Sequence, residues 1–565
     1  MPVRTLAIFA CFILFLVLIG GVFVRSTQAA NITVNVAYDS LANPDSNPAV
    51  QNSNDCSLRE AIQNANDDAA TYNDCPAGSG ADVISFTVGT ITFDAEIYIV
   101  SDIQMNGAVT FDGGNSNRMF VLASPGNGVL RIDNVTFQNG EDQSGGAILM
   151  QGGGLVCTES RFENNFAIAN GGAIYGNGPL DLNGCFFENN QAVTDGGAIY
   201  HFGADPGSII GTVFRDNSAG NDGPGSGGAI YATSAMSITG SAFDGNATNT
   251  GEDTGKGGGA IFNGSELVSG MVITASAFGG NRVDGTDGNG GAIFNNGLSA
   301  LAINYSHFGT SPLPLPSPFD TITEPNSVTG ENSRGGAVFV FGATNIVGTS
   351  FIGNTSANDG GAFAYGSLSD NITIANSTFS GNSATNNGGA IYNPNDDALL
   401  TLTNVTITGN TAGSGGGIYN DGDGDNVDTL NDEILLQNSI ISGNGGSPAN
   451  CGGGTLSAEG TNNVLPVGEC ANAAGVTGDP QLGSLELTFS VPNIITWVHP
   501  LGSSSAALGI GDPTVCSGFP VLNLDQRAFP RPQGDANCDA GAYESDAISA
   551  TDTPTATATP TASET

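Results

Sequence analysis

Short runs of alternating hydrophobic and polar residues, each introduced by a pair of glycines, recur along most of the chain. The clearest example is Gly171-Gly172-Ala173-Ile174-Tyr175. Comparable blocks begin at Gly145, Gly171, Gly196, Gly227, Gly258, Gly290, Gly335, Gly360 and Gly388, and a Gly-Gly-Gly-Ile-Tyr variant begins at Gly415. The blocks are roughly 25 to 32 residues apart, except for one long step before Gly335, and such a period is typical of a solenoid.

A second motif, Phe-x-x-Asn, lies between successive glycine blocks. It occurs at Phe162/Asn165, Phe187/Asn190, Phe214/Asn217, Phe243/Asn246, Phe278/Asn281, Phe351/Asn354 and Phe379/Asn382, and Ile replaces Phe at Ile407/Asn410 and Ile441/Asn444. Gly and Asn disfavour helix interiors and both accept positive φ at corners, so the apolar runs between them are interpreted as short strands. Stacked coils would place Phe over Phe and Ile over Ile, and Asn at matching corners would form amide ladders.

These patterns predict an all-β protein, a right-handed parallel β-helix solenoid with a short N-terminal capping helix and a small C-terminal cap module. The right hand follows from the general handedness of β-crossovers. About fourteen coils, spaced about 4.8 Å apart, would form a rod on the order of 65 Å long. A disordered Gly-rich chain is the alternative, and the strict phase of Phe and Ile argues against it.

The first 30 residues (1–30) are typical of a secretory signal peptide. Arg4 precedes an apolar run at residues 6–24, and small residues follow near Ala29. An uncleaved membrane anchor is the alternative, because the apolar run is near the length that spans a bilayer. In both cases the rest of the chain faces outside the cell, and contact with a membrane is expected only through this leader.

Residues 31–82 are expected to cap the first coil. Within the run at residues 56–62, Ser57 and Glu60 form a capping box that starts a short helix. One apolar face of this helix consists of Leu58, Ile62 and Ala65. The helix can cover strand edges that the first coil would otherwise expose. Capping and a local ion pair account for Arg59 and Glu60, and an acid/base pair is the alternative.

The β-helix repeats are predicted to occupy residues 83–465. The long step before Gly335 contains a proline-rich run at residues 311–318, which cannot join the interior of a sheet. We interpret it as a loop that leaves one corner of a coil. It is either a tolerated insertion or a loop on a binding face.

The repeat ends before residues 466–546, which are predicted to form a separate module. This segment holds the run Asp-Gln-Arg-Ala-Phe-Pro-Arg-Pro from Asp525 and the run Cys-Asp-Ala-Gly-Ala-Tyr-Glu that ends at Glu544. Arg527 and Arg531 are expected to pair with Asp525 or Glu544 inside the module, and ligand binding is the alternative. Residues 547–565 are mostly Thr, Ala and Pro, so they are expected to form an extended tail without a core.

Three of these segments resemble known families. The glycine blocks and Phe-x-x-Asn motifs, over about residues 137–444, are similar to the repeats of the chlamydial polymorphic outer-membrane protein family. Residues 56–62 resemble the CSLREA motif found near the start of bacterial surface β-helix proteins. Residues 466–546 resemble the choice-of-anchor module that ends many such proteins, although residues 507–512 depart from its usual pattern. The resemblances imply a bacterial surface β-helix that ends in a cap.

The composition narrows the set of partners. The chain has 565 residues and a net charge of −42, with 54 acidic and 12 basic side chains. Nucleic acids and anionic membrane surfaces are therefore poor partners, whereas divalent cations are plausible ones. The alternative reason for the charge is solubility, because like-charged rods repel one another.

The cysteines predict disulfide bonds. Apart from Cys11 in the leader, they are Cys56, Cys75, Cys157, Cys185, Cys451, Cys470, Cys516 and Cys538. An even number in an exported chain indicates oxidised pairs. We expect sequential pairing, although the sequence does not prove the connectivity. The pairs would be Cys56–Cys75, Cys157–Cys185, Cys451–Cys470 and Cys516–Cys538.

An acidic stretch is the candidate metal site. Its carboxylates at alternate positions, Asp421, Asp423 and Asp425, together with Asp428, suit the oxygen ligands of Ca²⁺. The pattern departs from an EF-hand, because Asn426 stands where Gly belongs. A solvated acidic turn is the alternative, so Ca²⁺ is a possible cofactor and no other cofactor is expected.

No motif for catalysis stands out in the sequence. The chain lacks the R-I-K and G-H-G motifs of β-helix polygalacturonases, and His201, His307 and His499 are interpreted as surface or turn residues. We therefore expect a secreted or cell-surface, structural or adhesin-like protein. It would bind carbohydrate (surface glycans) or other extracellular proteins without catalysis. The alternative is a Ca²⁺-dependent carbohydrate-active enzyme, a polysaccharide lyase or glycoside hydrolase, on the same scaffold.

Overall fold

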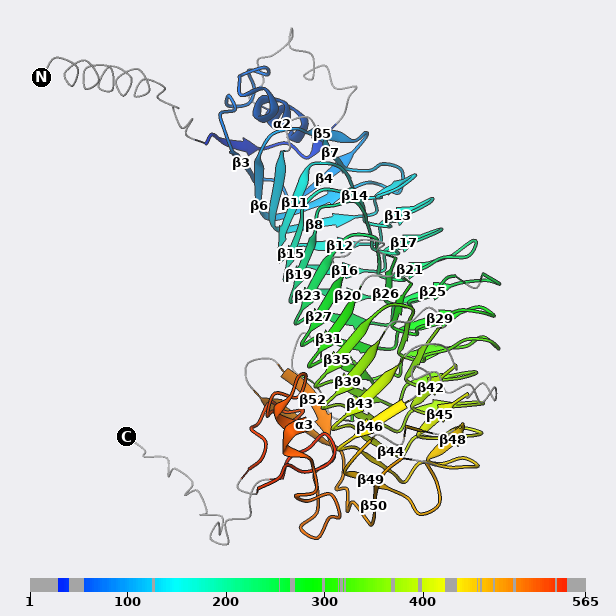
Figure 1. Ribbon diagram of the computed structural model, residues 1–565. Coiled ribbons are helices and arrows are strands. Elements are labelled where there is room, and N and C mark those ends of the chain that lie inside the picture. Colours follow the sequence, from blue (N-terminus) through cyan, green and yellow to red (C-terminus); the bar gives the residue numbers. More distant parts are fainter. Residues whose placement is uncertain are drawn as a thin grey trace, which may run out of the picture.

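The chain folds into a parallel β-helix whose coils stack into a rod, as the computed structural model shows (Figure 1). The structure describes residues 29–545, apart from residues 40–54, 124–127, 254, 265–269, 297–299, 313–314, 316–318, 320–321, 367–370, 395–398, 422–433, 455, 458–459, 471–472, 491–493 and 534–535. The expected signal peptide lies almost entirely outside the described residues, and the expected tail lies wholly outside them. The right hand of the spiral stays a prediction.

Sheet A has 28 strands in two parallel ladders, and each typical coil contributes one strand to each ladder. The first ladder contains β1 (Asn31–Val34), β3 (Asp82–Phe86), β11 (Gly154–Thr158), β15 (Leu180–Asn183), β19 (Gly207–Ile210), β23 (Met236–Thr239), β27 (Met271–Thr274), β31 (Leu301–Asn304), β35 (Thr344–Val347), β39 (Ile372–Ala375), β43 (Leu400–Thr403) and β46 (Ile434–Gln437). The second contains β2 (Tyr38–Asp39), β4 (Thr90–Phe93), β12 (Arg161–Glu163), β16 (Phe186–Glu188), β20 (Val213–Arg215), β24 (Ala242–Asp244), β28 (Ala277–Gly279), β32 (His307–Gly309), β36 (Ser350–Ile352), β40 (Thr378–Ser380), β44 (Thr406–Thr408), β47 (Ile440–Ser442), β49 (Asn463–Leu465) and β50 (Gly475–Thr477). The long strands β6 (Ile103–Asp112) and β8 (Val129–Gln138) belong to both ladders.

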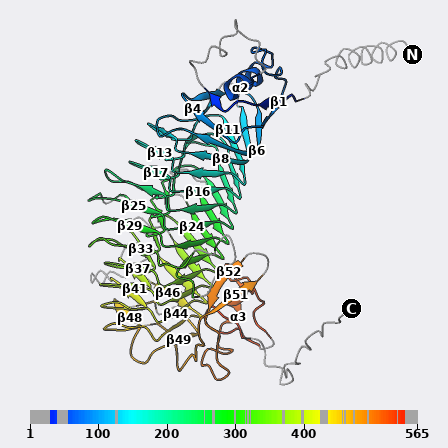
Figure 2. The same cartoon turned by 180° about the vertical axis from the view of Figure 1, so that it is seen from behind.

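Two further parallel sheets complete the coils. Sheet B has 13 strands: β5 (Ile97–Ile99), β7 (Phe120–Ala123), β10 (Ile148–Gln151), β14 (Ile174–Asn177), β18 (Ile199–His201), β22 (Ile230–Ala232), β26 (Ile261–Asn263), β30 (Ile293–Asn295), β34 (Val338–Val340), β38 (Phe363–Tyr365), β42 (Ile391–Asn393), β45 (Ile418–Asn420) and β48 (Cys451–Gly453). Sheet C has nine short strands: β9 (Glu141–Asp142), β13 (Phe166–Ala167), β17 (Gln191–Ala192), β21 (Ser218–Ala219), β25 (Ala247–Asn249), β29 (Arg282–Asp284), β33 (Ser327–Val328), β37 (Thr355–Ser356) and β41 (Ser383–Ala384). Figure 2 shows these short strands along one edge of the rod.

The glycine pairs form the corner that leads into sheet B. Gly196 has a φ of 68°, which a residue with a side chain rarely adopts. A Cβ atom on Gly197 would lie 2.0 Å from the carbonyl oxygen of Gly228 in the next coil. The first glycine therefore allows the turn, and the second allows neighbouring coils to approach, which explains why the pair recurs.

The interior confirms the predicted stacking of Phe over Phe. Nine rings, from Phe137 to Phe379, stack with centroids 4.6 to 5.0 Å apart. Phe187, Phe214 and Phe243 have no exposed surface. Parallel rings at this separation attract each other, and this attraction stabilises the fold in addition to the burial of their apolar surface.

The Asn residues of the Phe-x-x-Asn motif form the expected amide ladder. From Asn165 to Asn410, each side-chain Nδ2 donates to the Oδ1 of the corresponding Asn in the next coil at 2.8 to 3.0 Å. Asn444 Nδ2 then donates to Oδ1 of Asn450, six residues further along the chain, at 2.9 Å. The ladder ends where Asn450 Nδ2 donates to Glu469 Oε2 at 2.9 Å. These amides are buried, so the ladder holds the register between coils.

The long step in the repeat is a normal coil with an insertion. Phe308 joins the ring stack and Asn326 joins the amide ladder, so residues 309–325 replace the usual two residues of the motif. Within the insertion, Leu315, Phe319 and Ile322 are buried against the apolar cluster that contains Trp497. The insertion is therefore part of the packed structure.

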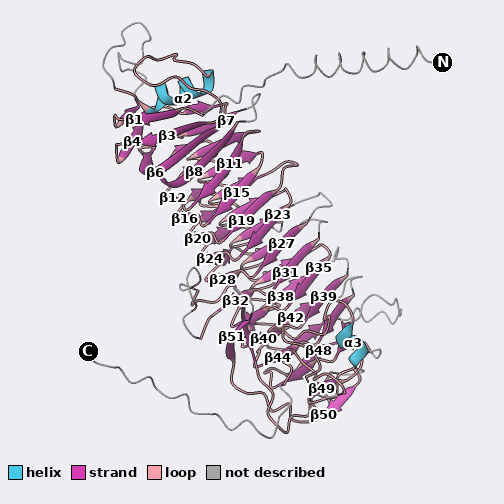
Figure 3. Cartoon of the chain, turned by 90° about the vertical axis from the view of Figure 1, so that its left-hand side faces the viewer, coloured by secondary structure: helices cyan, strands magenta, loops and turns pink. Residues whose placement is uncertain are grey.

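A short helix closes the N-terminal end of the rod, as predicted (Figure 3). Helix α2 (Leu58–Asp67) begins with the Ser57–Glu60 capping box. Its buried residues Leu58, Ile62 and Ala65 join the main core. Arg59 donates to the backbone carbonyls of Ala95 and Glu96.

The C-terminal segment lies along the flank of the rod, beside sheet A (Figure 1). It contains the antiparallel hairpin β51 (Glu486–Ser490) and β52 (Ile494–Val498) and helix α3 (Pro513–Ser517). Asn376 Nδ2 donates to the carbonyl of Leu524 at 2.8 Å, and Ala542 N donates to Thr406 Oγ1 at 3.0 Å. The segment thus binds the side of several coils, while β50 is the last strand of sheet A.

Among the described residues, no helix has the length and apolar character needed to cross a membrane.

Candidate functional site

The outward face of sheet B carries apolar side chains on twelve consecutive strands. Parallel pairing places these residues in one line, which we call the aromatic row: Tyr98, Val121, Leu149, Tyr175, Tyr200, Tyr231, Phe262, Phe294, Phe339, Ala364, Tyr392 and Tyr419. The alternate residues, such as Ile199 and Ile230, point into the core. A sheet face that meets solvent normally carries polar residues, so this row requires an explanation.

The outward face of sheet A gives the contrast. Its first ladder presents mostly small or polar side chains there, among them Asp181, Ser208, Ser237, Thr373 and Thr401. The difference between the two faces shows that the row is a property of sheet B and not of the repeat as a whole.

The rings of the row stack along the axis of the rod. Tyr200 and Tyr231 lie 4.5 Å apart and nearly parallel, and Tyr231 and Phe262 lie 4.7 Å apart. Phe202 packs beside Tyr175 at 5.3 Å. Further along the row, Phe262 and Phe294, and Phe294 and Phe339, meet edge to face at 5.3 Å.

The row is accessible in one part and covered in another. Tyr175, Tyr200 and Tyr231 are half-buried, whereas Phe262, Phe294 and Phe339 are at most 3 % exposed. We call the three half-buried tyrosines the open stretch. It is the part of the central row that a ligand can reach.

Charged pairs lie beside the row at three places. Arg118 contacts Glu96 at 2.5 Å and Asp142 at 3.4 Å, next to Tyr98, whose hydroxyl donates to Glu96. Lys256, the only lysine of the chain, donates to Asp195 Oδ1 at 2.9 Å. Arg334 lies 3.8 Å from Asp359. Each cation therefore has a carboxylate partner.

Arg334 also fills a gap in the row. Ala364, which lies between Phe339 and Tyr392 in the row, has no ring. The guanidinium of Arg334 lies 5.1 Å from the ring centroid of Tyr392. Asp359 also accepts hydrogen bonds from the backbone N–H and side chain of Asn387. The planar guanidinium thus continues the stack where a ring is missing.

Burial changes the ionisation of the groups beside the row. Desolvation raises the pKa of the Asp195 carboxyl, and the Lys256 ammonium opposes that rise. Desolvation likewise raises the pKa of Asp359, opposed by the Asn387 hydrogen bonds and Arg334. Burial also raises the pKa of the Tyr231 hydroxyl, so this group stays neutral and remains able to donate a hydrogen bond.

The predicted Ca²⁺ ligands are mostly outside the described residues. Asp421 is described, and its Oδ2 accepts a hydrogen bond from the Tyr392 hydroxyl at 3.0 Å. Asp423, Asp425 and Asp428 lie outside the described part of the chain. No cluster of three or more possible metal ligands occurs among the residues that the structure describes. Calcium binding by this stretch stays a prediction.

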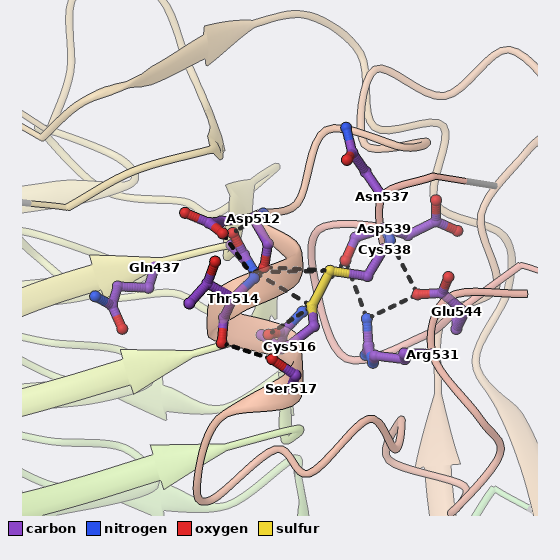
Figure 4. Close-up of a disulfide and its surroundings, with 12 residues drawn as sticks. Gln437, Asp512, Thr514, Cys516, Ser517, Arg531, Asn537, Cys538, Asp539 and Glu544 are labelled. Carbon is purple, nitrogen blue, oxygen red and sulfur yellow. Dashed lines mark hydrogen bonds and ion pairs between the residues drawn. A yellow bond between two sulfur atoms is a disulfide. The ribbon is translucent and has the colours of Figure 1, made fainter.

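The eight cysteines are joined in the four pairs that sequential pairing predicts. These are Cys56–Cys75, Cys157–Cys185, Cys451–Cys470 and Cys516–Cys538. The second pair links Cys157 of β11 to Cys185, which lies in the next coil between β15 and β16, and the fourth links α3 to Cys538 in the C-terminal segment (Figure 4).

The two arginines of the C-terminal segment pair within it, as expected. Arg527 contacts Asp525 at 2.7 Å. Arg531 contacts Glu544 at 3.2 Å (Figure 4). Arg531 also donates to the backbone carbonyls of Leu524, Asp539 and Gly541. Both arginines are buried, and their bonds hold the segment together.

The interpretation of His201 and His307 as surface or turn residues is wrong. Both are strand residues with no exposed surface. His201 bonds to Ser234 Oγ and the carbonyl of Gly178, and His307 Nδ1 bonds to Ser350 Oγ. Burial lowers the pKa of His307 to about 4. His499 bonds to Ser380 and Gly483 between the module and the rod.

Five segments of the chain are similar to the Chlamydia polymorphic membrane protein (Chlamydia_PMP) repeat. The matched residues are 159–177, 184–201, 211–233, 376–394 and 404–421. Each matched PMP-type segment ends just after a glycine block and includes one tyrosine of the aromatic row: Tyr175, Tyr200, Tyr231, Tyr392 or Tyr419.

One solved structure is similar over most of its length. The crystal structure of pectate lyase Pel9A matches at 14% identity, covering 92% of this chain and 97% of that chain, with a TM-score of 0.32. A likeness of this size carries no conclusion about activity or substrate. The comparison with curated proteins finds no match.

The aromatic row was not predicted from the sequence. Its signal is present, because a Tyr or Phe follows the inward Ile in most glycine blocks. In a three-residue strand, however, inward and outward apolar residues look alike until the register between coils is known.

Proposed function

We propose that this protein is displayed outside the cell and binds extended glycans through the aromatic row of sheet B without transforming them. The observation that carries the proposal is the row itself, an apolar line on twelve strands whose open stretch is accessible to a ligand. Apolar residues that gather on an exposed face mark binding surfaces more often than chance. Four disulfides and the leader-like N-terminus support an extracellular location.

The spacing of the row favours a glycan over a peptide. Neighbouring rungs of a parallel sheet are about 4.8 Å apart, whereas side chains on one face of an extended peptide repeat about every 6.7 Å. The spacing between rungs is close to the length of one sugar unit. Successive sugars of a glycan can therefore contact equivalent hydroxyl groups and ring edges of successive rungs. A peptide would lose this match after two or three residues.

A glycan array probed with the full chain, with and without Ca²⁺, tests the proposal. The matched variants are Tyr200→Ala on the row and Ser237→Ala on the outward face of sheet A. We expect wild type and Ser237→Ala to bind the same glycans, and Tyr200→Ala to bind them about tenfold more weakly or worse, as loss of a central aromatic contact does. Equal binding by Tyr200→Ala would overturn the proposal.

Analysis of the bound glycans separates binding from catalysis. Intact oligosaccharides after long incubation support a binding protein. Shortened products that appear only with Ca²⁺ would instead establish the alternative, a Ca²⁺-dependent carbohydrate-active enzyme on this scaffold.

A further inference from the structure

The charges beside the aromatic row follow one pattern, and it restricts the kind of glycan that can bind. Each of the three cations along the row is held by a carboxylate, and each place has a second carboxylate nearby. Arg118 contacts both Glu96 and Asp142. Lys256 contacts Asp195, and the charge of Asp253 acts on Asp195. At the third place, Arg334 is paired with Asp359, and the charge of Asp421 acts on Asp359.

The local balance at each place is therefore one positive and two negative charges. An anion needs a cation that is free to approach it, and none of these three is free. The whole chain adds to the effect, because its net charge is −42. A negatively charged ligand would meet repulsion both at the row and on approach to it.

The groups that remain for a ligand on the open stretch are neutral. The hydroxyls of Tyr200 and Tyr231 hydrogen-bond to each other, which leaves each able to make a further hydrogen bond, as the hydroxyl of Tyr175 also can. Phe202 packs beside Tyr175 and Tyr200 and adds an apolar wall. Sugar hydroxyls and the C–H faces of a sugar ring match this combination of partners. Carboxylate or sulfate groups do not.

We infer that the open stretch selects uncharged glycans and rejects uronate-containing or sulfated ones. This inference rests on the proposed function and specifies its ligand class. Like charges held several ångströms apart near a protein surface cost on the order of a tenfold loss of affinity or more. One uronate placed beside the Lys256–Asp195 pair should therefore be enough to weaken binding measurably.

Matched oligosaccharides test the inference directly. Cellohexaose and mannohexaose are each compared with the counterpart in which every C6 alcohol is a carboxylate, by calorimetry with the full chain in EDTA. We expect a neutral member to bind and its uronate counterpart to bind at least about tenfold more weakly, with the gap narrowing at high salt. Uronate binding as tight as neutral binding would overturn the inference and leave the proposed function standing. Absence of binding by every member of this set and of the glycan array would overturn both.

A charge variant supplies an independent test. Asp195→Asn frees the Lys256 ammonium from its carboxylate, and we expect it to gain about tenfold in affinity for the uronate hexasaccharide. Asp181→Asn removes the same charge from the exposed outward face of sheet A and is the control, for which we expect no such gain. Unchanged uronate affinity in Asp195→Asn would contradict the inference. Equal gains in both variants would show that net charge alone, and not the row, sets the selectivity.

Discussion

Removal of one rung of the amide ladder should weaken the rod locally by an amount that the hydrogen bonds predict. The side chain of Asn190 makes four hydrogen bonds and has no exposed surface. Its Nδ2 donates to Asn217 Oδ1 at 3.0 Å and to the Phe162 carbonyl at 2.9 Å. Its Oδ1 accepts from the backbone N–H and the Nδ2 of Asn165. Asn190→Ala removes all four of these bonds, although Asn217 Oδ1 keeps the bond from the backbone N–H of residue 190 and Asn165 Nδ2 keeps its bond to the Phe137 carbonyl.

Each buried hydrogen bond that is lost costs roughly 1 kcal/mol, so the loss of four bonds in Asn190→Ala should cost about 4 kcal/mol. Exposed Asn183 lies in the same coil, and Asn183→Ala should change stability by less than about 0.5 kcal/mol. The effect should spread to the neighbouring coils only, because a solenoid is stabilised by contacts between adjacent repeats.

Hydrogen exchange followed by mass spectrometry measures this local stability. In Asn190→Ala we expect backbone amides of the strands around residues 162, 187 and 214 to lose up to about a thousandfold of their protection, which is the equivalent of 4 kcal/mol. Coils near Phe351 should be unchanged. Unaltered protection around residue 190, or a uniform loss along the whole rod, would refute the reasoning.

Three further outcomes are expected. Phe243→Ala removes one ring from the stack, between Phe214 at 4.8 Å and Phe278 at 4.7 Å, and should cost about 3 to 5 kcal/mol in urea unfolding, with Phe243→Leu costing much less. The folded-state pKa of His307 is about 4 and its ordinary value is 6.5, so the unfolded state binds more protons between these values. Stability should therefore fall by roughly 3 kcal/mol as pH drops from 6.5 to 4, and His307→Asn should lose this pH dependence in unfolding curves. Arg531→Met leaves Glu544 buried without its cation and should cost about 3 to 5 kcal/mol, with limited proteolysis releasing the C-terminal segment while the coils around Phe187 stay intact.

The coils could be predicted from the repeat period, because each coil places the same residue types at the same positions. The glycine pairs mark the corner before sheet B, and the Phe and Asn positions mark the inward stack and the ladder, so the alignment of rungs followed from spacing alone. Phe308 and Asn326 were not recognised as a Phe-x-x-Asn motif, because the insertion at residues 309–325 separates them in the sequence. Local sequence cannot show that two distant residues complete one rung.

The aromatic row and the position of the C-terminal segment depend on contacts between distant residues. Tyr200 and Tyr231 become neighbours only through the register between β18 and β22. Asn376 and Leu524 meet only because the chain returns along the flank of the rod. The burial of His307 is likewise a consequence of the packing on that flank and has no signature in its immediate sequence.

Oxidative footprinting of tyrosines with a bound oligosaccharide tests the central claim most directly. The full chain would be labelled with hydroxyl radicals in the presence and absence of the glycan that the array identifies, and oxidation of each tyrosine would be read by mass spectrometry. The account predicts that Tyr175, Tyr200 and Tyr231 become protected while Tyr38, which is 40% exposed at the far end of the rod, does not change. Protection elsewhere, with the open stretch oxidised as before, would contradict it.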